Sequence, residues 1–317
     1  MDNYRNSNIP LVIAFTPNYF IPAATCLLSI LKHSDKSDKF DVIVLLSKDL
    51  PQVMKDKLHR FGGERMSFTY LNLEGRLADI YVDEKYTVAA SYRLLLPDLL
   101  PEYDKVLYID CDVIVRNNLA ELYRSVELRD NYMAGVFEAT LDFQIPHLEA
   151  IGCKPGEYIN SGFLIMNLTK LRQDNMASKF IEASKAEYLE FPDQDVINQL
   201  CKGKILGLPP YCNSIRTFFL PQYKSSFLKF YSEKDWQAVQ EHGTVHYTGT
   251  KPWDSFTVEF KVWWQYYEAL PKEVKQEGKR NTGMYLLYKF YSSKLGALLG
   301  TTFQRTYRTI KYKEKLG

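Results

Sequence analysis

The sequence lacks long hydrophobic runs, and this absence excludes a membrane-spanning helix. No stretch reaches the ~18 consecutive apolar residues that such a helix needs. The most apolar candidate, residues 284–303, is interrupted by Lys289 and Lys294, so it could lie on a membrane but not cross one. The first ten residues are polar and lack the basic region followed by an apolar run that marks a signal peptide. We therefore expect no export.

Cysteine is also scarce, and its pattern argues against structural disulfides. The five cysteines, at positions 26, 111, 153, 201 and 212, form no CxxC pair. An odd number cannot all pair within one chain. A reducing cytoplasm is the compartment that fits this usage best.

The chain carries little net charge, but that charge is unevenly distributed. The total is +2, whereas residues 279–317 contain nine Lys or Arg and one Glu, so the preceding residues carry about −6. A basic tail on an acidic body suggests contact with an anionic surface, either lipid headgroups or nucleic acid, although a solvated basic helix is an alternative. The body contains no recognisable nucleic-acid-binding module, so we expect lipid.

Aromatic and basic side chains are interleaved in this tail, a combination that suits a lipid headgroup interface. The aromatic residues are Tyr285, Tyr288, Phe290, Tyr291, Tyr307 and Tyr312, and the basic ones are Lys289, Lys294, Arg305, Arg308, Lys311, Lys313 and Lys315. We expect a catalytic domain over residues 1–270 and a helical, membrane-associating tail over residues 271–317. The protein would then be cytoplasmic and peripheral on the inner face of the plasma membrane.

Short runs rich in Val and Ile alternate with helical patterns in the first third of the chain. The expected strands are 9–15, 41–46, 67–71 and 105–109, and the expected helices are 21–31, 52–61 and 89–96. This alternation predicts an α/β doubly wound sheet, whose ligands lie outside the carboxyl ends of the strands. The later pattern is less regular, with strands expected at 133–137 and 162–167, helices at 175–189 and 195–201, and loops over 208–231.

Two carboxylates follow the fourth expected strand, in the segment Asp110-Cys111-Asp112. Side chains alternate along extended backbone, so the two aspartates point to one side and Cys111 to the other. Hard oxygen ligands of this kind hold Mg²⁺ or Mn²⁺ together with substrate phosphates. Two alternatives are a pair of surface carboxylates at a turn and the nucleophile motif of phosphatases. Val113 and Ile114 follow, where the phosphatase motif usually continues with Gly-Thr.

A second polar segment runs from His246 to Trp253. An imidazole ligand at His246 would favour Mn²⁺ over Mg²⁺, although a single histidine is also often a hydrogen-bonded structural residue. Gly249 would let the backbone approach a phosphate, and Lys251 would add a positive charge to it.

Together these segments resemble glycosyltransferase family 8 over roughly residues 9–253. The motifs that carry the resemblance are Ala14 to Tyr19, Ser91 to Leu94, Asp110 to Asp112, Asn160 to Gly162, Asp193 to Asp195 and His246 to Trp253. The family implies a Rossmann-like GT-A fold, a UDP-sugar donor and retention of anomeric configuration. It also implies Mn²⁺, with Mg²⁺ as a possible substitute, held by Asp110, Asp112 and His246.

The same resemblance assigns residues to the donor nucleotide. Ala14, Asn18 and Tyr19 would form the uridine site, with the Tyr19 ring against the uracil face or simply packed in the core. Thr16 stands where the bacterial relatives commonly have Asp, which leaves the base preference less certain, and its hydroxyl can still form hydrogen bonds. Cys111 is assigned to the same site.

Further residues are assigned to the donor sugar. Arg93 resembles the arginine that reaches the nucleotide sugar, with a surface salt bridge as the alternative. Glu138 stands where relatives often have Asp. Asn160, Asp193 and Gln194 are the expected catalytic residues, although the two amides could equally be helix caps or loop bridges.

The expected reaction is transfer of a hexose, glucose or galactose, from the UDP-sugar to a hydroxyl acceptor. Gln194 resembles the residue on the far face of the donor sugar, where an amide is a poor nucleophile, so we favour front-side displacement over a covalent intermediate. Lipopolysaccharide or another cell-envelope glycan is the expected acceptor, and a protein or glycan primer is the second choice. A nucleotide-sugar binding protein without transferase activity is the alternative from another class.

Overall fold

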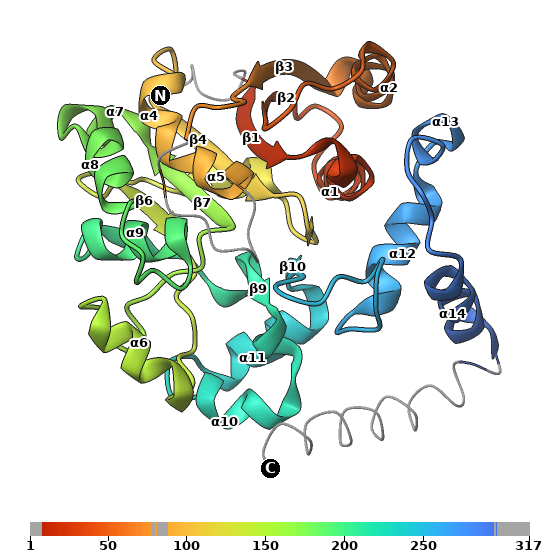
Figure 1. Cartoon of the computed structure of the whole chain (residues 1–317). Coiled ribbons are helices and arrows are strands. Elements are labelled where there is room, and N and C mark those ends of the chain that lie inside the picture. The colour runs from red at the N-terminus through yellow and green to blue at the C-terminus, as the bar shows by residue number, and fades with distance from the viewer. Residues whose placement is uncertain (1–7, 78–79, 81–87, 295, 297–317) are drawn as a thin grey trace.

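A computed structural model describes residues 8–77, 80, 88–294 and 296 (Figure 1). Within these residues, seven strands form a main sheet in the order β3-β2-β1-β4-β7-β6-β8. Their bounds are β1 Ile9–Phe15, β2 Phe40–Leu46, β3 Met66–Asn72, β4 Lys105–Asp110, β6 Met133–Gly135, β7 Phe163–Asn167 and β8 Ile205–Gly207. β1 to β4 run parallel, whereas β7 is antiparallel to both β4 and β6. The sheet is therefore mixed but mainly parallel.

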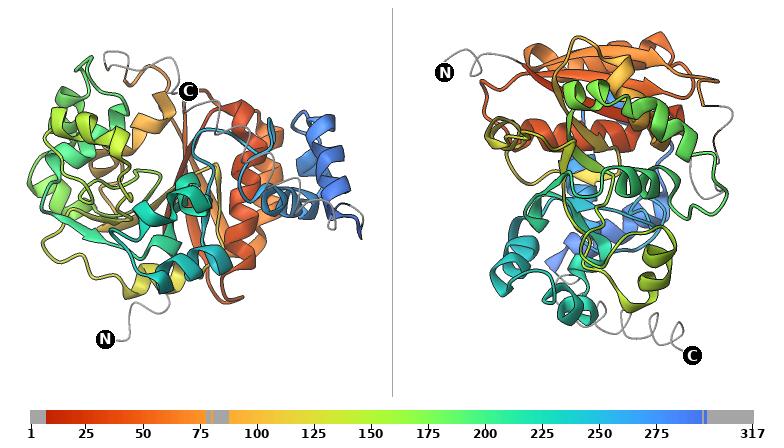
Figure 2. Two further views of the ribbon diagram at one scale, coloured as in Figure 1. Left: turned by 90° about the horizontal axis from the view of Figure 1, so that it is seen from below. Right: turned by 90° about the vertical axis from the view of Figure 1, so that its left-hand side faces the viewer.

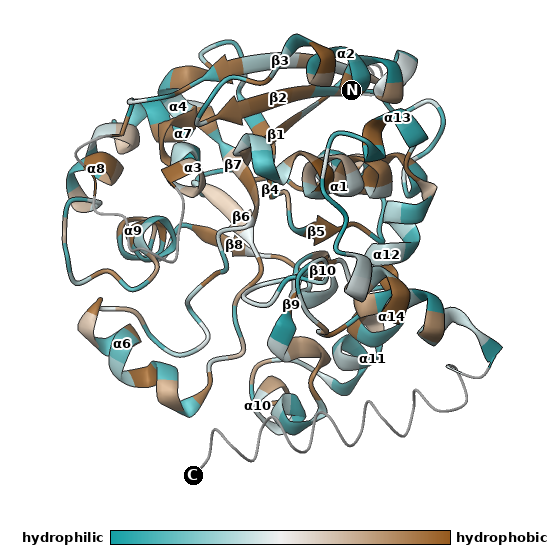
Figure 3. Cartoon of the chain, turned by 45° about the vertical axis from the view of Figure 1, so that its right-hand side comes forward, coloured by the Kyte–Doolittle hydropathy of each residue, from teal (hydrophilic) through white to brown (hydrophobic). Residues whose placement is uncertain are grey.

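Helices cover both faces of this sheet, because its strands are apolar on both sides. In β1, Leu11 and Ile13 enter one buried cluster and Val12 and Ala14 enter the other. The first cluster includes residues of α1 (Phe20–Lys32), α2 (Gln52–Gly62), α5 (Leu119–Ser125), α11 (Glu233–His242) and α12 (Phe260–Ala269). The second includes residues of α3 (Val88–Ser91), η3 (Tyr92–Leu95), α4 (Leu96–Leu99), α7 (Leu168–Gln173), α8 (Met176–Ala183) and α9 (Pro192–Leu200). Figure 2 shows the two layers on either side of the strands, and Figure 3 shows the central strands coloured as hydrophobic.

A small second sheet connects distant parts of the chain. β5 (Val113–Ile114) follows β4 almost directly, and β10 (Val245–His246) lies between it and β9 (Ser214–Ile215). His246 is opposite Val113 in the antiparallel pair. This register places an imidazole beside the aspartates that end β4.

The α/β architecture expected from the sequence is confirmed, with several boundaries corrected. The expected helix at 89–96 is three short helices, α3, η3 and α4, and Pro97 lies in the first turn of α4, where proline's missing N–H costs nothing. The strand expected at 133–137 ends at Gly135, and the helix expected at 175–189 ends at Ala183. α9 begins at Pro192 rather than at 195, so Asp193 and Gln194 lie in its first turn.

The segment 208–231 contains short turns, as expected, namely η5 (Pro210–Cys212), η6 (Arg216–Phe219), η7 (Pro221–Tyr223) and α10 (Lys224–Phe227), but it also contains the strand β9, which was not expected. The remaining elements are η1 (Pro17–Tyr19), η2 (Gly63–Arg65), η4 (Asp142–Gln144), α6 (Ile145–Ala150), α13 (Lys272–Lys275) and α14 (Thr282–Ser292). All five cysteines are buried and free. No helix in the described part of the chain is long and apolar enough to cross a membrane.

α14 packs on α12 through stacked rings, with 6.1 Å between the centroids of Trp264 and Tyr288. Tyr288 and Tyr291 are buried, so the expectation that these two rings meet lipid headgroups is wrong. Leu286 and Phe290 are instead exposed, at 61% and 42%. The expected tail residues 297–317, including Arg305, Tyr307, Arg308, Lys311, Tyr312, Lys313 and Lys315, lie outside the described residues.

Candidate active site

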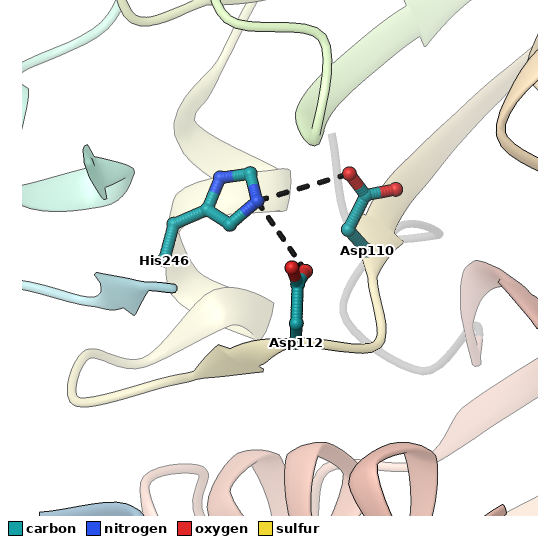
Figure 4. Close-up of side chains that lie close together, drawn as sticks. All are labelled: Asp110, Asp112 and His246. Atoms are coloured by element: carbon teal, nitrogen blue, oxygen red, sulfur yellow. Dashed lines mark ion pairs between the residues drawn. The ribbon is translucent and has the colours of Figure 1, made fainter. Parts of the chain in front are cut away.

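Asp110, Asp112 and His246 converge at the carboxyl end of β4 (Figure 4). His246 Nε2 lies 3.3 Å from Asp112 Oδ1 and 3.8 Å from Asp110 Oδ2. One ligand atom from each of the three residues lies within 4.8 Å of the others. Two carboxylates and an imidazole at this spacing could hold one divalent ion with oxygen and nitrogen ligands.

Gly162 makes this convergence possible. A Cβ at this position would lie 2.3 Å from His246 Cε1 and 2.6 Å from Asp110 Oδ2. Real side chains do not approach so closely, so any other residue here would displace two of the three candidate ligands. The residues present therefore fit a metal centre, with the space for it kept by the missing side chain.

Lys251 forms an ion pair with Asp112 on the side away from His246. Burial alone would raise the pKa of Asp112, but Lys251 and His246 hold it well below its usual range. Burial raises the pKa of Cys111 well above its usual value, and the neighbouring aspartates add to this effect. Asp112 is therefore ionised near neutral pH, whereas Cys111 keeps its proton and is not a thiolate ligand.

Arg93 lies beneath the aspartates, with a side chain only 2% exposed. Its Nη2 is 2.9 Å from Asp110 Oδ1, and its Nε is 3.1 Å from Asp193 Oδ2. The guanidinium also stacks 4.4 Å from the centroid of the Tyr108 ring. Burial would lower the pKa of Arg93, but the two aspartates raise it above its usual value. Arg93 thus joins a candidate metal ligand to a candidate catalytic carboxylate through one rigid group.

Glu138, Asn160 and Gln194 form a buried polar cluster beside this arginine. Asn160 Nδ2 donates to Gln194 Oε1 over 3.0 Å, and Gln194 Nε2 donates to Glu138 Oε1 over 3.3 Å. Burial raises the pKa of Glu138, against the hydrogen bonds that it accepts. Burial likewise raises the pKa of Asp193, against the effect of Arg93. The side chains expected to be catalytic are therefore together in the structure.

A cavity of about 360 Å³ opens beside the aspartates. Its lining residues are Ala14, Phe15, Thr16, Tyr19, Ala89, Ala90, Tyr108, Asp110, Cys111, Asp112, Gly249 and Lys251. Ala14 is opposite Asp110 in the β1–β4 register, which places the end of β1 next to the metal centre. Gly249 has φ +75°, a left-handed conformation that favours glycine.

The profile of Glycosyl transferase family 8 matches residues 10–257, which include the whole of this constellation. The chain belongs to glycosyltransferase family 8. Among curated proteins, a lipopolysaccharide 1,2-glucosyltransferase of Escherichia coli is 28% identical over 249 residues, covering 74% of this chain and 70% of the relative. Family membership and these relatives make the chain a glycosyltransferase enzyme.

Solved structures show that this family 8 chain has the GT-A fold. The galactosyltransferase LgtC, in complex with donor and acceptor sugar analogues, superimposes with a TM-score of 0.69 at 23% identity, covering 85% of this chain and 100% of that chain. The apo structure of the bifunctional glycosyltransferase WbbM gives a TM-score of 0.72 at 22% identity and covers 86% of this chain. The match covers 52% of WbbM, so this chain spans about half its length.

Most residues expected for a family 8 site lie around this one centre, but Asn18 does not line the cavity, and the surface alternative for Arg93 is wrong. Asn18 is exposed, and its Oδ1 accepts a hydrogen bond from the Thr16 hydroxyl. Arg93 is buried between carboxylates rather than forming the surface salt bridge considered as its alternative.

Several contributing residues had no role assigned to them from the sequence. Tyr108, Ser161 and Asn213 contact the candidate ligands or amides, and Gly162 leaves space for them. The Asn160-Ser161-Gly162 motif pointed to two of these positions. Asn213 belongs to no pattern, because its contacts depend on the pairing of β9 with β10.

A larger cavity of about 800 Å³ lies at the opposite end of the strands, lined by Ile9, Lys105 and Asn167 among others. In a mainly parallel sheet the carboxyl ends carry the ligand site, so this cavity is not the donor site. The candidate metal-binding set found within the described residues does not border it.

Proposed function

We propose that the protein transfers a hexose, glucose or galactose, from a UDP-sugar to a hydroxyl acceptor with retention of anomeric configuration. The observation that carries the proposal is the candidate metal-binding set of Asp110, Asp112 and His246, whose two aspartates line a cavity. Asp110 and Asp112 line this cavity together with residues assigned to the nucleotide. A diphosphate in that cavity would reach the same aspartates.

Asp110, Asp112 and His246 would hold Mn²⁺, or Mg²⁺ in its place. A bound divalent ion supplies charge neutralisation to the departing diphosphate. Lys251 adds a second positive charge at the cavity wall. Burial would lower the pKa of Lys251, but its pairing with Asp112 raises that pKa above its usual value, so the side chain is charged. The leaving diphosphate would therefore be stabilised by the bound ion and by Lys251.

The nucleotide would lie between the end of β1 and the segment around Gly249. Tyr19 borders the cavity and is held by Trp253, with 5.8 Å between ring centroids in an edge-to-face arrangement. Thr16 and Asn18 would offer one hydroxyl and one amide to the base edge in place of a carboxylate. Ala14 leaves room for the uracil beside them, and Cys111 forms part of the floor as a neutral thiol.

The donor sugar would face Glu138, Asn160, Asp193 and Gln194. The Oε1 atom of Gln194 accepts hydrogen bonds from Asn160 Nδ2 and from the Ser161 N–H, each at 3.0 Å. The carboxylate of Asp193 is held by Arg93 and Ser161. These contacts support front-side displacement, in which the departing phosphate oxygen takes the acceptor proton and the protein positions the reactants.

A cell-envelope glycan such as lipopolysaccharide is the acceptor that we propose. Support comes from the Escherichia coli relative named as a lipopolysaccharide 1,2-glucosyltransferase. A protein or glycan primer is the second candidate. Donor glucose and galactose differ in one hydroxyl orientation, which a single hydrogen bond can distinguish.

We expect the protein to release UDP from one UDP-sugar of a panel in the presence of Mn²⁺, and far more slowly without it. Coupled detection of UDP measures this before an acceptor is known, and the anomeric configuration of a transferred sugar tests retention. Calorimetry with UDP and Mn²⁺ should show binding that depends on the metal.

Two results would contradict parts of this proposal. UDP and Mn²⁺ binding without release or transfer, across the donor panel and with envelope glycans supplied, would favour a binding protein. A sugar covalently attached to Asp193 or another carboxylate, found by mass spectrometry of stalled enzyme, would replace front-side displacement by double displacement.

We also propose that residues 271–317 form a membrane-associating region next to a catalytic domain over 1–270, and that the protein lies on the cytoplasmic face of the plasma membrane. The described part of this region offers Leu286 and Phe290 as exposed apolar side chains on α14. Lys289 lies between them in the sequence and pairs with Glu268 at 2.7 Å. An apolar face flanked by cations is typical of helices that lie in a headgroup interface.

The double variant Leu286→Ser with Phe290→Ser should float about tenfold less with anionic phosphatidylglycerol vesicles than the parent protein, because two apolar side chains no longer enter the interface. Both side chains are exposed, so the stacking of Tyr288 on Trp264 of α12 and of Tyr291 on Phe256 is retained, and only the ring contact of Phe290 with Tyr291 is lost. Val53→Ser, at a 49% exposed position on α2, is the matched control. Equal flotation of the double variant and the control would contradict the membrane role of α14.

A further inference from the structure

Asn213 is a fully buried amide that connects the metal-binding histidine to the amides of the donor-sugar site. It lies between η5 and β9, with an exposed fraction of 0%. Its side chain is 3.0 Å from His246 Nδ1 on one side and 3.0 Å from Asn160 Oδ1 on the other. Ser214, which follows Asn213, pairs with Val245, which precedes His246, so the β9–β10 pairing fixes the backbone beside both side chains.

The backbone determines the orientation of each group in this chain. The Gly162 N–H can only donate, and it lies 3.1 Å from the atom of Asn160 that must therefore be the oxygen. The Asn213 atom facing that oxygen must be the amide nitrogen. Its other atom is then the oxygen, and it faces His246 Nδ1, which must carry the proton.

With its proton on Nδ1, the neutral imidazole of His246 has its free lone pair on Nε2. Nε2 is the atom that faces Asp110 and Asp112, and without a proton it is free to bind a metal ion. Histidine ligands commonly donate their other N–H to an oxygen, which orients the ring and sets its tautomer. Here that oxygen belongs to a neutral amide, so it adds no charge to the centre.

The other end of the chain is oriented in the same way. The Ser161 N–H lies 3.0 Å from Gln194 Oε1, which accepts from Asn160 Nδ2 as well. The remaining Gln194 nitrogen then faces Glu138. The backbone N–H groups of Gly162 and Ser161 thus determine which atoms donate and which accept along the whole chain of side chains from His246 to Glu138.

We infer that Asn213 is a positioning residue that sets the tautomer of His246 and, through its second bond, the orientation of Asn160. This inference rests on the proposed function for the roles of His246 and Asn160. The expected consequence is that Asn213 contributes separately to metal affinity, through its oxygen, and to turnover, through its nitrogen.

The tautomer can be measured directly, without metal, donor or activity. Nitrogen NMR of protein with isotope-labelled histidine should show a protonated Nδ1 in His246, whether or not Nε2 also carries a proton beside the aspartates, with the signal assigned by comparison with His246→Gln. An unprotonated Nδ1 in the folded parent protein would overturn the inference. This result is independent of whether the protein transfers a sugar, so it separates the inference from the proposed function.

Variants separate the two bonds. Asn213→Asp keeps an oxygen facing His246, adds a negative charge there and loses the donor to Asn160, so Mn²⁺ affinity should be kept or increased while kcat falls about tenfold or more. Asn213→Leu loses both, and Mn²⁺ affinity in the presence of UDP, measured by electron paramagnetic resonance, should fall about 10- to 100-fold. Ser214→Ala removes a buried hydroxyl on the next residue, which donates to Pro210 O, and is the matched control.

Thermal unfolding of all three variants shows whether each is folded at the assay temperature. If folded Asn213→Leu binds Mn²⁺ as tightly as Ser214→Ala, the positioning role is refuted. If Asn213→Asp and Asn213→Leu lose metal affinity equally, the assignment of the oxygen to His246 is refuted, because only one of them lacks it.

Discussion

Asp112→Asn should reduce metal-dependent turnover of the UDP-sugar by about a thousandfold, corresponding to a loss of about 4 kcal/mol of transition-state stabilisation. Asp112 is the most central of the three candidate ligands, because it faces His246 on one side and Lys251 on the other. Those two neighbours keep its pKa below the usual range, against the effect of burial, so the carboxylate is charged near neutral pH. An amide of the same shape removes that charge and little else. Steady-state UDP release and calorimetry with Mn²⁺ and UDP measure the effect.

Asp142→Asn is the control for this variant, because Asp142 is 86% exposed and forms an ion pair with the exposed Lys229. It should behave as the parent protein. Turnover by Asp112→Asn within tenfold of that control, at saturating Mn²⁺, would mean that Asp112 is not a ligand of the catalytic metal.

Gly162→Ala should lower turnover by about a hundredfold, although it removes no functional group. The added Cβ would overlap His246 Cε1 and Asp110 Oδ2, so both ligands must move. Displacements of about 1 Å at a reacting centre can cost about a hundredfold in rate. Mn²⁺ affinity should fall with the rate, whereas unfolding free energy should fall only by the ~1–3 kcal/mol typical of overpacking.

Gly283→Ala provides the comparison on α14, where a Cβ would meet only Asn281 Oδ1 at an ordinary 3.5 Å. It should leave activity unchanged, and it should slightly stabilise the helix because alanine loses less backbone entropy than glycine. Gly162→Ala with parental Mn²⁺ affinity and turnover would show that the metal centre does not need the space at this position.

The first half of the fold could be predicted because its elements follow local rules. The runs at 9–15 and 41–46 are buried on both faces, so they read as strands of a parallel sheet without further context. The antiparallel β7 was not predicted in direction, because its sequence is as apolar as that of its parallel neighbours. β5, β9 and β10 have two residues each, too few for any periodicity to indicate a strand.

The candidate site was predicted to the extent that its residues carry distinctive chemistry. Asp110, Asp112 and His246 stood out as ligand types, and the structure brings them together. Asn213 did not stand out, because a single amide in a turn has the same sequence appearance whether it bonds to water or to a buried imidazole. The burial of Arg93 between Asp110 and Asp193 was equally hidden, since it depends on three elements meeting in space.

The pairing of β5 with β10 has a consequence for how the protein folds. Asp112 and Lys251 are 139 residues apart in the sequence, so the site closes only after the intervening chain has taken up its structure. Contacts over such distances carry a large loop-closure cost and form late in slow-folding topologies. Recovery of Mn²⁺ affinity during refolding would therefore lag behind the burial of β1 to β4, and a nascent chain would acquire its metal only when synthesis had passed His246.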